Sequence, residues 1–159
     1  MKKYVVTDPS YILSNEDWDK CCEIIQYNGP DDKNKWIAFN QAIAGKLAQM
    51  TGEPAYVEDT GFGDWSNEIY GPGVLNHTFA ADAGMVCVCR LTEEVEKKLN
   101  IQEHDSCVAV FEANELVKVT FDTDDSNWTI VNIVTDQGLI ISNDVDEDEE
   151  DDEEEDEED

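Results

Sequence analysis

Three aspartates at the ends of predicted strands carry the chemistry that this chain could perform. Asp8 precedes Pro9, Asp64 follows Gly63, and Asp82 leads into a step of small residues. If their loops converge, the three carboxylates could bind a divalent metal ion through hard oxygen ligands, or could supply a general acid and a general base. No two of them show a spacing diagnostic of a metal site, and Asp in turns commonly accepts hydrogen bonds from its own backbone. We therefore interpret all three as turn residues and keep a metal-assisted hydrolase as an alternative.

The stretch 59–67 is rich in glycine and aromatic residues and is predicted to be a loop. Its Gly-Phe-Gly core could hold a phosphate only if a helix began directly after it, and no helical pattern follows. Two interpretations remain open, namely aromatic rings packed over a sheet edge and a recognition patch for a basic partner. The aromatic residues in and around the stretch are Tyr56, Phe62, Trp65 and Tyr70. The residues assigned to partner binding are Asp59, Asp64, Trp65 and Glu68. A pocket for a cationic or polar small molecule is a further alternative.

The C-terminal stretch 144–159 holds 15 acids and one Val. An extended chain places one such charge about every 3.4 Å, close to the phosphate spacing along one nucleic-acid strand. The stretch could therefore compete with nucleic acid for a basic protein, or it could simply keep the chain soluble. A second acidic cluster lies at 122–125. The residues assigned to partner binding in these two stretches are Asp122, Asp124, Asp125, Asp146, Glu147 and Asp148.

The charge balance limits the partners that this chain can have. The formal net charge is −29, and outside the terminal stretch 24 acids still face ten bases. Direct binding of nucleic acid or of an anionic membrane is excluded as a main function, because phosphate recognition needs Lys and Arg. No segment has the length of a membrane span. A basic partner protein is favoured instead, with faster encounter at low salt.

The five cysteines do not form a pattern that indicates disulfides or a metal site. Their number is odd, and Cys21 and Cys22 are adjacent. Cys87 and Cys89 face the same side of a predicted strand, a spacing that differs from the Cys-x-x-Cys of zinc sites. We expect them to be small core residues. Without a signal-like N-terminus, the sequence predicts a reducing, cytoplasmic compartment, and no cofactor or metal is expected.

The fold prediction is organised around the apolar run 83–89, which is typical of a strand buried on both faces. One helix is predicted from a cap at Ser14 to Asn28, a second from 31–32 to Gly52, and a short third helix after Thr92. Gly45 inside the second helix costs about 1 kcal/mol relative to Ala, and we expect it to pack closely against another element.

The remaining predicted strands are short and mostly antiparallel. They cover 3–7, 55–58, 68–70, 107–112, 116–121, 128–134 and 139–141. A hairpin is expected across 113–115, and Val117, Val119 and Phe121 are expected to form one apolar face. The predicted fold class is α+β, with a mostly antiparallel sheet of six to eight strands packed with two main helices. Residues 1–143 are predicted to form one compact domain, and 144–159 a disordered polyacidic tail.

Three short motifs in the first half of the chain resemble a pattern found in small uncharacterised bacterial and phage proteins. The motifs are Asp8-Pro9-Ser10-Tyr11, Thr60-Gly61-Phe62-Gly63-Asp64 and Asp82-Ala83-Gly84. The family pattern has Asp-Pro-Cys-Tyr, so Ser10 replaces the Cys, which argues against a nucleophile there. The resemblance covers roughly residues 4–90 and implies a bacterial or phage context, but no activity. Small acidic phage proteins often inhibit nucleic-acid-binding machinery of the host, some as DNA mimics. The likeness to those inhibitors is an analogy between classes of protein and not a match of residues.

Together these patterns predict a non-enzymatic acidic interaction protein. It would be a phage or bacterial inhibitor that blocks a basic nucleic-acid-binding protein of defence or regulation by charge mimicry, in the cytoplasm of a bacterial or host cell. The metal-assisted hydrolase and the small-ligand binder remain alternatives.

Overall fold

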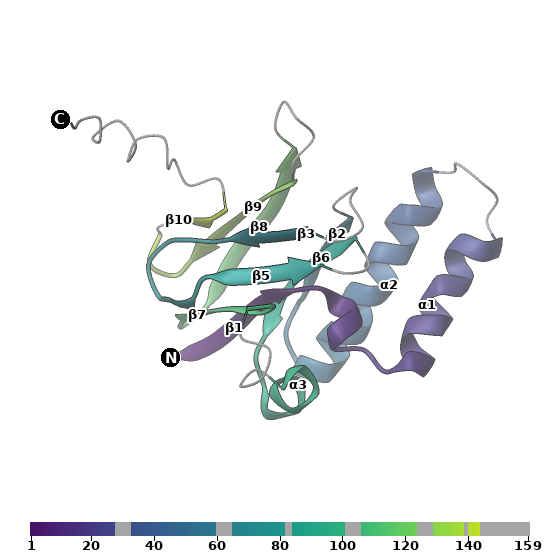
Figure 1. Cartoon of the computed structure of the whole chain (residues 1–159), viewed down its shortest axis with the longest axis horizontal. Helices are drawn as coiled ribbons and strands as arrows, with labels where there is room; N and C mark the ends of the chain where they lie inside the picture. Colours follow the sequence, from purple (N-terminus) through teal and green to yellow (C-terminus); the bar gives the residue numbers. More distant parts are fainter. Residues whose placement is uncertain are drawn as a thin grey trace.

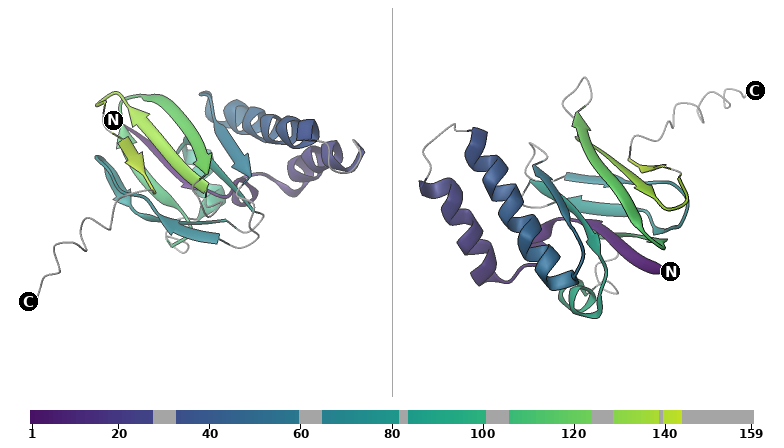
Figure 2. Two further views of the ribbon diagram at one scale, coloured as in Figure 1. Left: turned by 90° about the horizontal axis from the view of Figure 1, so that it is seen from above. Right: turned by 180° about the vertical axis from the view of Figure 1, so that it is seen from behind.

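The computed structural model describes residues 1–27, 33–59, 65–81, 84–100, 106–123, 129–138 and 140–143. These residues form three layers (Figure 1). Two long helices cover one face of a five-stranded sheet, and the strands of two smaller sheets cover its other face. Figure 2 shows the same order of layers from above and from behind. The predicted α+β class and the antiparallel pairing are confirmed.

The central layer is a sheet with the strand order β2-β6-β1-β7-β4, in which each neighbouring pair is antiparallel. Its strands are β1 (Lys2–Thr7), β2 (Tyr56–Asp59), β4 (Val74–Asn76), β6 (Met85–Arg90) and β7 (Ala109–Ala113). In β6, Cys87 and Cys89 pack under the helices, while Val86 and Val88 pack on the opposite side. The prediction of a strand buried on both faces is therefore confirmed. Burying each Val side chain contributes about 1.5–3 kcal/mol.

The helical layer consists of α1 (Asn15–Tyr27) and α2 (Lys33–Thr51), with α3 (Glu93–Leu99) and the 3-10 turn η1 (Pro9–Tyr11) at its margins. Ser14 Oγ accepts a hydrogen bond from Asp17 N at 3.2 Å, and Thr92 Oγ1 accepts one from Val95 N at 3.3 Å. Gly52 ends α2 with a φ of 81°. The predicted caps at Ser14 and Thr92 and the predicted end of α2 are confirmed. The predicted end of the first helix at Asn28 and the predicted start of the second at 31–32 lie outside the described residues.

The third layer consists of two small sheets that are joined by one bridge. One sheet has the order β10-β9-β8, and the other pairs β3 with β5. The bounds are β3 (Trp65–Glu68), β5 (Thr78–Ala81), β8 (Leu116–Thr123), β9 (Thr129–Thr135) and β10 (Ile140–Ser142). Tyr70 and Ser142 exchange two backbone hydrogen bonds of 3.0 Å, which join the two sheets. β3 starts inside the predicted loop 59–67, so the predicted strand at 68–70 is displaced by several residues.

The predicted hairpin across residues 113–115 is wrong. β7 stays in the central sheet, whereas β8 pairs with β9 in the third layer. Asp136 stabilises this crossing, because its Oδ1 accepts hydrogen bonds from Asn114 N at 2.9 Å and from Glu115 N at 3.1 Å. The described residues consequently form ten strands in three sheets instead of one sheet of six to eight strands.

The predicted apolar face of β8 is wrong at its first member. A register shift between Leu116 and Lys118 places an extra residue, Val117, in this strand, and Val117 is 56% exposed. Leu116 instead packs on the core together with Val119 and Phe121. A bulge of this kind reverses the alternation of side chains, which the apolar pattern by itself does not reveal.

Gly45 lies in the middle of α2, and its predicted close packing is wrong. The residue is exposed, and a Cβ atom built there would meet no heavy atom within 4 Å. Glycine at this position therefore costs helix stability without a packing contact to offset it.

We expect Gly45→Ala to raise the free energy of unfolding by about 0.5–1 kcal/mol, because Ala restricts the unfolded chain and favours the helix. Thermal and urea unfolding would measure the change. Gly73→Ala is the matched control and should destabilise the protein, because Gly73 has a φ of 85° and an added Cβ would clash with the carbonyl oxygen of Glu112. A destabilised Gly45→Ala variant would contradict the open environment of Gly45.

Candidate functional site

One side of the third layer faces away from both cores, and we call it the outer face. Residues directly opposed in antiparallel strands project to the same side of a sheet. Asn132 pairs with Thr120 and with Ser142, and Ser142 pairs with Tyr70. The residues between them along each strand point inward. These inward residues are Ile69, Val131, Ile133 and Ile141, which are fully buried.

A row of hydrogen bonds crosses the outer face from β8 to β10. Asn132 Nδ2 donates to Asp122 Oδ2 at 3.3 Å, and Ser142 Oγ donates to Asn132 Oδ1 at 2.7 Å. On the far side of the Tyr70–Ser142 bridge, the Tyr70 hydroxyl donates to Glu68 Oε1. Both carboxylates are exposed and are oriented by neutral donors.

The two acidic stretches of the sequence attach at one end of the outer face. Thr123 and Thr129, the described residues nearest to 124–128, pair with each other. Asn143, the last described residue, accepts from Val131 N at 2.7 Å and donates to the Thr129 carbonyl at 2.9 Å. The residue that precedes 144–159 is consequently held beside the start of β9.

Glu68 and Asp122 lie at the same end. Asp122 is opposite Ile130, one residue from Thr129. The chain segments around Tyr70 and Ser142 run antiparallel. The residues before Tyr70 therefore lie toward the end of β10 where Asn143 is held. The structure thus brings together two predicted partner-binding residues that are 54 positions apart in the sequence.

The other predicted partner-binding residues have different positions. Asp59 is exposed at the end of β2, opposite Met85 in the central sheet, and does not belong to the outer face. Trp65 begins β3 opposite Ala81. The remaining ones lie outside the described residues: Asp64, Asp124, Asp125, Asp146, Glu147 and Asp148. The glycine-rich core 60–64 of the proposed small-ligand pocket also lies outside them.

The alternative hydrolase site can be judged at Asp8 alone, because Asp64 and Asp82 lie outside the described residues. Asp8 is fully buried, and its Oδ1 accepts a hydrogen bond from Ser10 N at 2.8 Å at the start of η1. This is the turn role expected from the sequence. Among the described residues, no three His, Cys, Asp or Glu side chains are grouped so that they could hold a metal ion.

The cysteines among these residues behave as core side chains. Cys21, Cys87 and Cys89 are buried and free of disulfides. Burial raises the pKa of the Cys87 thiol well above its usual value, and the neighbouring Cys89 raises it further. A thiol with a raised pKa is a poor nucleophile at neutral pH.

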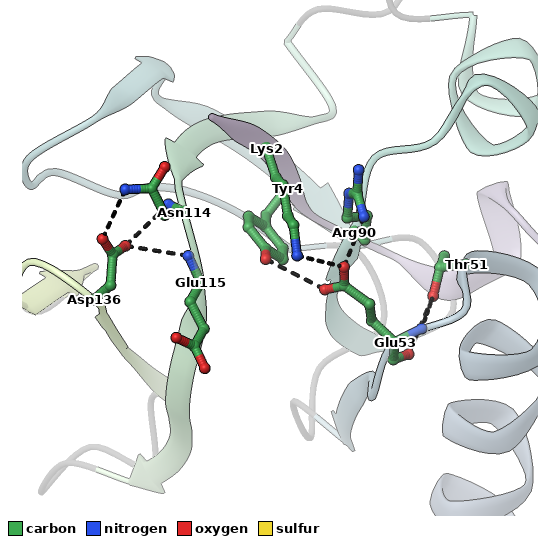
Figure 3. Close-up of polar contacts among 8 residues, drawn as sticks. All are labelled: Lys2, Tyr4, Thr51, Glu53, Arg90, Asn114, Glu115 and Asp136. Atoms are coloured by element: carbon green, nitrogen blue, oxygen red, sulfur yellow. Dashed lines mark hydrogen bonds and ion pairs between the residues drawn. The ribbon is translucent and has the colours of Figure 1, made fainter.

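Sequence reasoning missed a polar cluster around Glu53 (Figure 3). The Glu53 carboxylate accepts from Lys2 Nζ at 3.1 Å, from Arg90 Nη1 at 2.7 Å and from the Tyr4 hydroxyl at 3.3 Å. The cluster ties the turn after α2 to β1 and β6. Its members are too far apart in the chain for any local spacing to indicate it. We assign it to stability, because the Glu53 carboxylate is occupied by these three donors.

Comparison with known proteins provides no relative of this chain: no family model, no curated protein and no solved structure matches it. None of the helices in the described ranges is long and apolar enough to cross a membrane.

The pKa of Glu53 is shifted in the opposite direction from the pKa values of Tyr4 and Glu58. Burial raises the pKa of Glu53, but the hydrogen bonds and charges of Lys2 and Arg90 outweigh it, so the net pKa is lowered. Burial, followed by the charge of Glu53, raises the pKa of Tyr4 to about 12. At Glu58, by contrast, burial and the charge of Asp59 both raise the pKa of the carboxyl.

We expect Glu53→Gln to lower the free energy of unfolding at pH 7 by about 1–3 kcal/mol, because two cations lose their partner. A lowered folded pKa contributes stability above the unfolded value, and this contribution is lost as the pH falls through the folded pKa. The difference between wild type and variant should therefore shrink below about pH 4, which urea unfolding across pH 3–7 would measure.

Glu58→Gln removes the same charge within β2 and serves as the control. Because the folded pKa of Glu58 is raised, its charged form opposes folding at neutral pH, and the variant should be as stable as wild type or more stable. An equal loss of stability in both variants would contradict the assigned role of Glu53.

Proposed function

We propose that this chain is a non-enzymatic interaction protein that binds the basic surface of a nucleic-acid-binding protein and blocks it. The observation that carries the proposal is the shared end of the outer face. Glu68, Asp122, the strand ends that flank 124–128 and the attachment point of 144–159 are all located there. Two described carboxylates and the points where two acidic stretches join the described chain therefore lie at one end of this face, which a partner with complementary charge can use.

The basic residues offset this charge elsewhere in the molecule. Four of the ten Lys and Arg side chains form ion pairs with acids of the helices or of the turn after α2. On the described part of the outer face, Lys118 is the basic residue, and it lies four positions from Asp122 at the opposite end of β8. The end that bears the acidic stretches is therefore the more negative one.

Nucleic-acid-binding proteins are the favoured class of partner because their surfaces are built to neutralise closely spaced phosphates. A stretch with 15 acids in 16 positions presents a similar linear charge density. The ordered carboxylates of the outer face would add a fixed orientation, which a charged tail alone lacks. The bacterial or phage context, which rests on the motif resemblance in residues 4–90, is part of the same proposal.

We expect the double variant E68Q/D122N to bind such a partner about 2- to 30-fold more weakly, since exposed ion pairs are worth about 0.2–1 kcal/mol each. Affinity capture from bacterial lysate with the full chain would supply the partner, and calorimetry at low and high salt would measure the affinity. The captured protein should lose nucleic acid when the full chain is added. Chain 1–143 should bind more weakly than the full chain but still measurably.

The control is D19N/E23Q, which removes the same net charge from exposed positions of α1. If both double variants weaken binding equally, only the net charge matters and the outer face has no special role. Binding that is unchanged between low and high salt would contradict charge mimicry, because exposed charges are screened within about 8–10 Å at physiological salt.

A further inference from the structure

The outer face carries an exposed tyrosine in an unusual position between a carboxylate and an imidazole. The Tyr70 hydroxyl donates to Glu68 Oε1, and its ring lies 4.8 Å from the His77 ring, tilted by 31°. Even with this neighbour, Tyr70 is 42% exposed. Large aromatic side chains that remain exposed beside charged groups are typical anchor points of protein interfaces.

Hydrogen bonds hold the backbone that carries this aromatic side chain. Tyr70 exchanges two 3.0 Å hydrogen bonds with Ser142, and the Ile69 amide donates to the His77 carbonyl at 2.8 Å. His77 Nδ1 also contacts the Ile69 carbonyl oxygen at 2.8 Å, which fixes the imidazole next to the tyrosine ring. A platform that is already ordered loses little conformational entropy when a ligand binds.

An exposed aliphatic side chain, Ile140, lies on the same face, on the side of Tyr70 away from Glu68. Ile140 is two residues before Ser142 on the same face of β10, so it is a diagonal neighbour of Tyr70, with Cα atoms about 7–8 Å apart in such pairs. Ile140 is 56% exposed, and its partner on β9 is the half-buried Val134. A long side chain with a charged head could therefore lay its aliphatic stem on Ile140.

This combination fits a guanidinium group better than an ammonium group. A guanidinium is planar, stacks on aromatic rings and is weakly hydrated, whereas an ammonium is compact and strongly hydrated. A phenol that donates to a carboxylate is polarised toward greater electron density, which strengthens its attraction for a cation. Glu68 retains a second carboxylate oxygen that can accept an N–H group of the same cation.

We propose that Tyr70 and Glu68, supported by His77 and Ile140, form an anchor subsite for an arginine side chain of the partner. The inference rests on the proposed function and names the residue type that the outer face selects. Charge attraction at Asp122 and the acidic stretches accepts any cation, whereas the Tyr70 subsite distinguishes arginine from lysine.

The test uses the full chain, labelled with ¹⁵N, and two capped peptides, hexa-arginine and hexa-lysine. Amide shifts of Glu68, Tyr70, His77 and Ser142 report binding at the subsite, and those of Asp122 and Asn132 report binding along the rest of the outer face. From the amide shifts at the subsite, we expect the arginine peptide to bind about 2- to 5-fold more tightly than the lysine peptide, as exposed cation–π contacts allow.

Two variants and one control make the result specific. Tyr70→Leu should bring the ratio of arginine to lysine affinity to about 1, and Tyr70→Phe, which keeps the ring but loses the Glu68 contact, should give an intermediate ratio. Trp36→Leu changes another exposed aromatic residue, on α2, and should leave the ratio unchanged. The dispersion of the amide spectrum shows whether each variant is folded.

The outcomes separate the two proposals. If both peptides shift Asp122 and Glu68 but the affinity ratio does not depend on Tyr70, the arginine subsite is overturned and the acidic face stands. If neither peptide shifts any residue of the outer face at low salt, the contribution of the body to the proposed function fails, and the subsite fails with it.

Discussion

The central sheet has to serve two separate hydrophobic cores, and the rest of the structure depends on this. Along β1 and β6, successive residues alternate between the core under the helices and the core under the third layer. Val5 and Cys87 belong to the first core, and Val6 and Val88 to the second, all fully buried. The middle of these two strands has no room for charge on either side. The acids of the described residues lie on the helices, in turns, on the outside of the third layer and on other strands of the central sheet.

Two polar contacts guide the chain around this sheet. Glu53 draws the turn after α2 to the ends of β1 and β6, and Asp136 holds the crossing by which the chain leaves β7 for β8 (Figure 3). Neither contact touches the outer face. Asp136 nevertheless positions it, because it holds the crossing at which β8 enters the third layer, whereas Glu53 joins the helical layer to the central sheet.

The acids of this protein include some that stabilise the fold and others that are exposed on the outer face. The carboxylates of Glu53 and Asp136 each accept several hydrogen bonds from within the chain, and their role is structural. Glu68 and Asp122 are exposed, each with one neutral donor from the outer face. Within the described ranges, these two carboxylates are oriented by neutral donors and form no ion pair, which suits a surface for a basic partner.

Local chemistry in the sequence determined the buried strand around Cys87 and Cys89, the helix caps at Ser14 and Thr92, and the turn role of Asp8. Each of these depends on neighbours within a few residues, so periodicity and capping residues are sufficient to predict them. Tertiary structure alone decided that β7 and β8 belong to different layers, that Val117 points outward and that Gly45 has no packing partner. It also decided that Glu68 and Asp122 lie at the same end of one face. These features depend on contacts between distant segments, and the free energy of such contacts is not encoded in the spacing of residues along the chain.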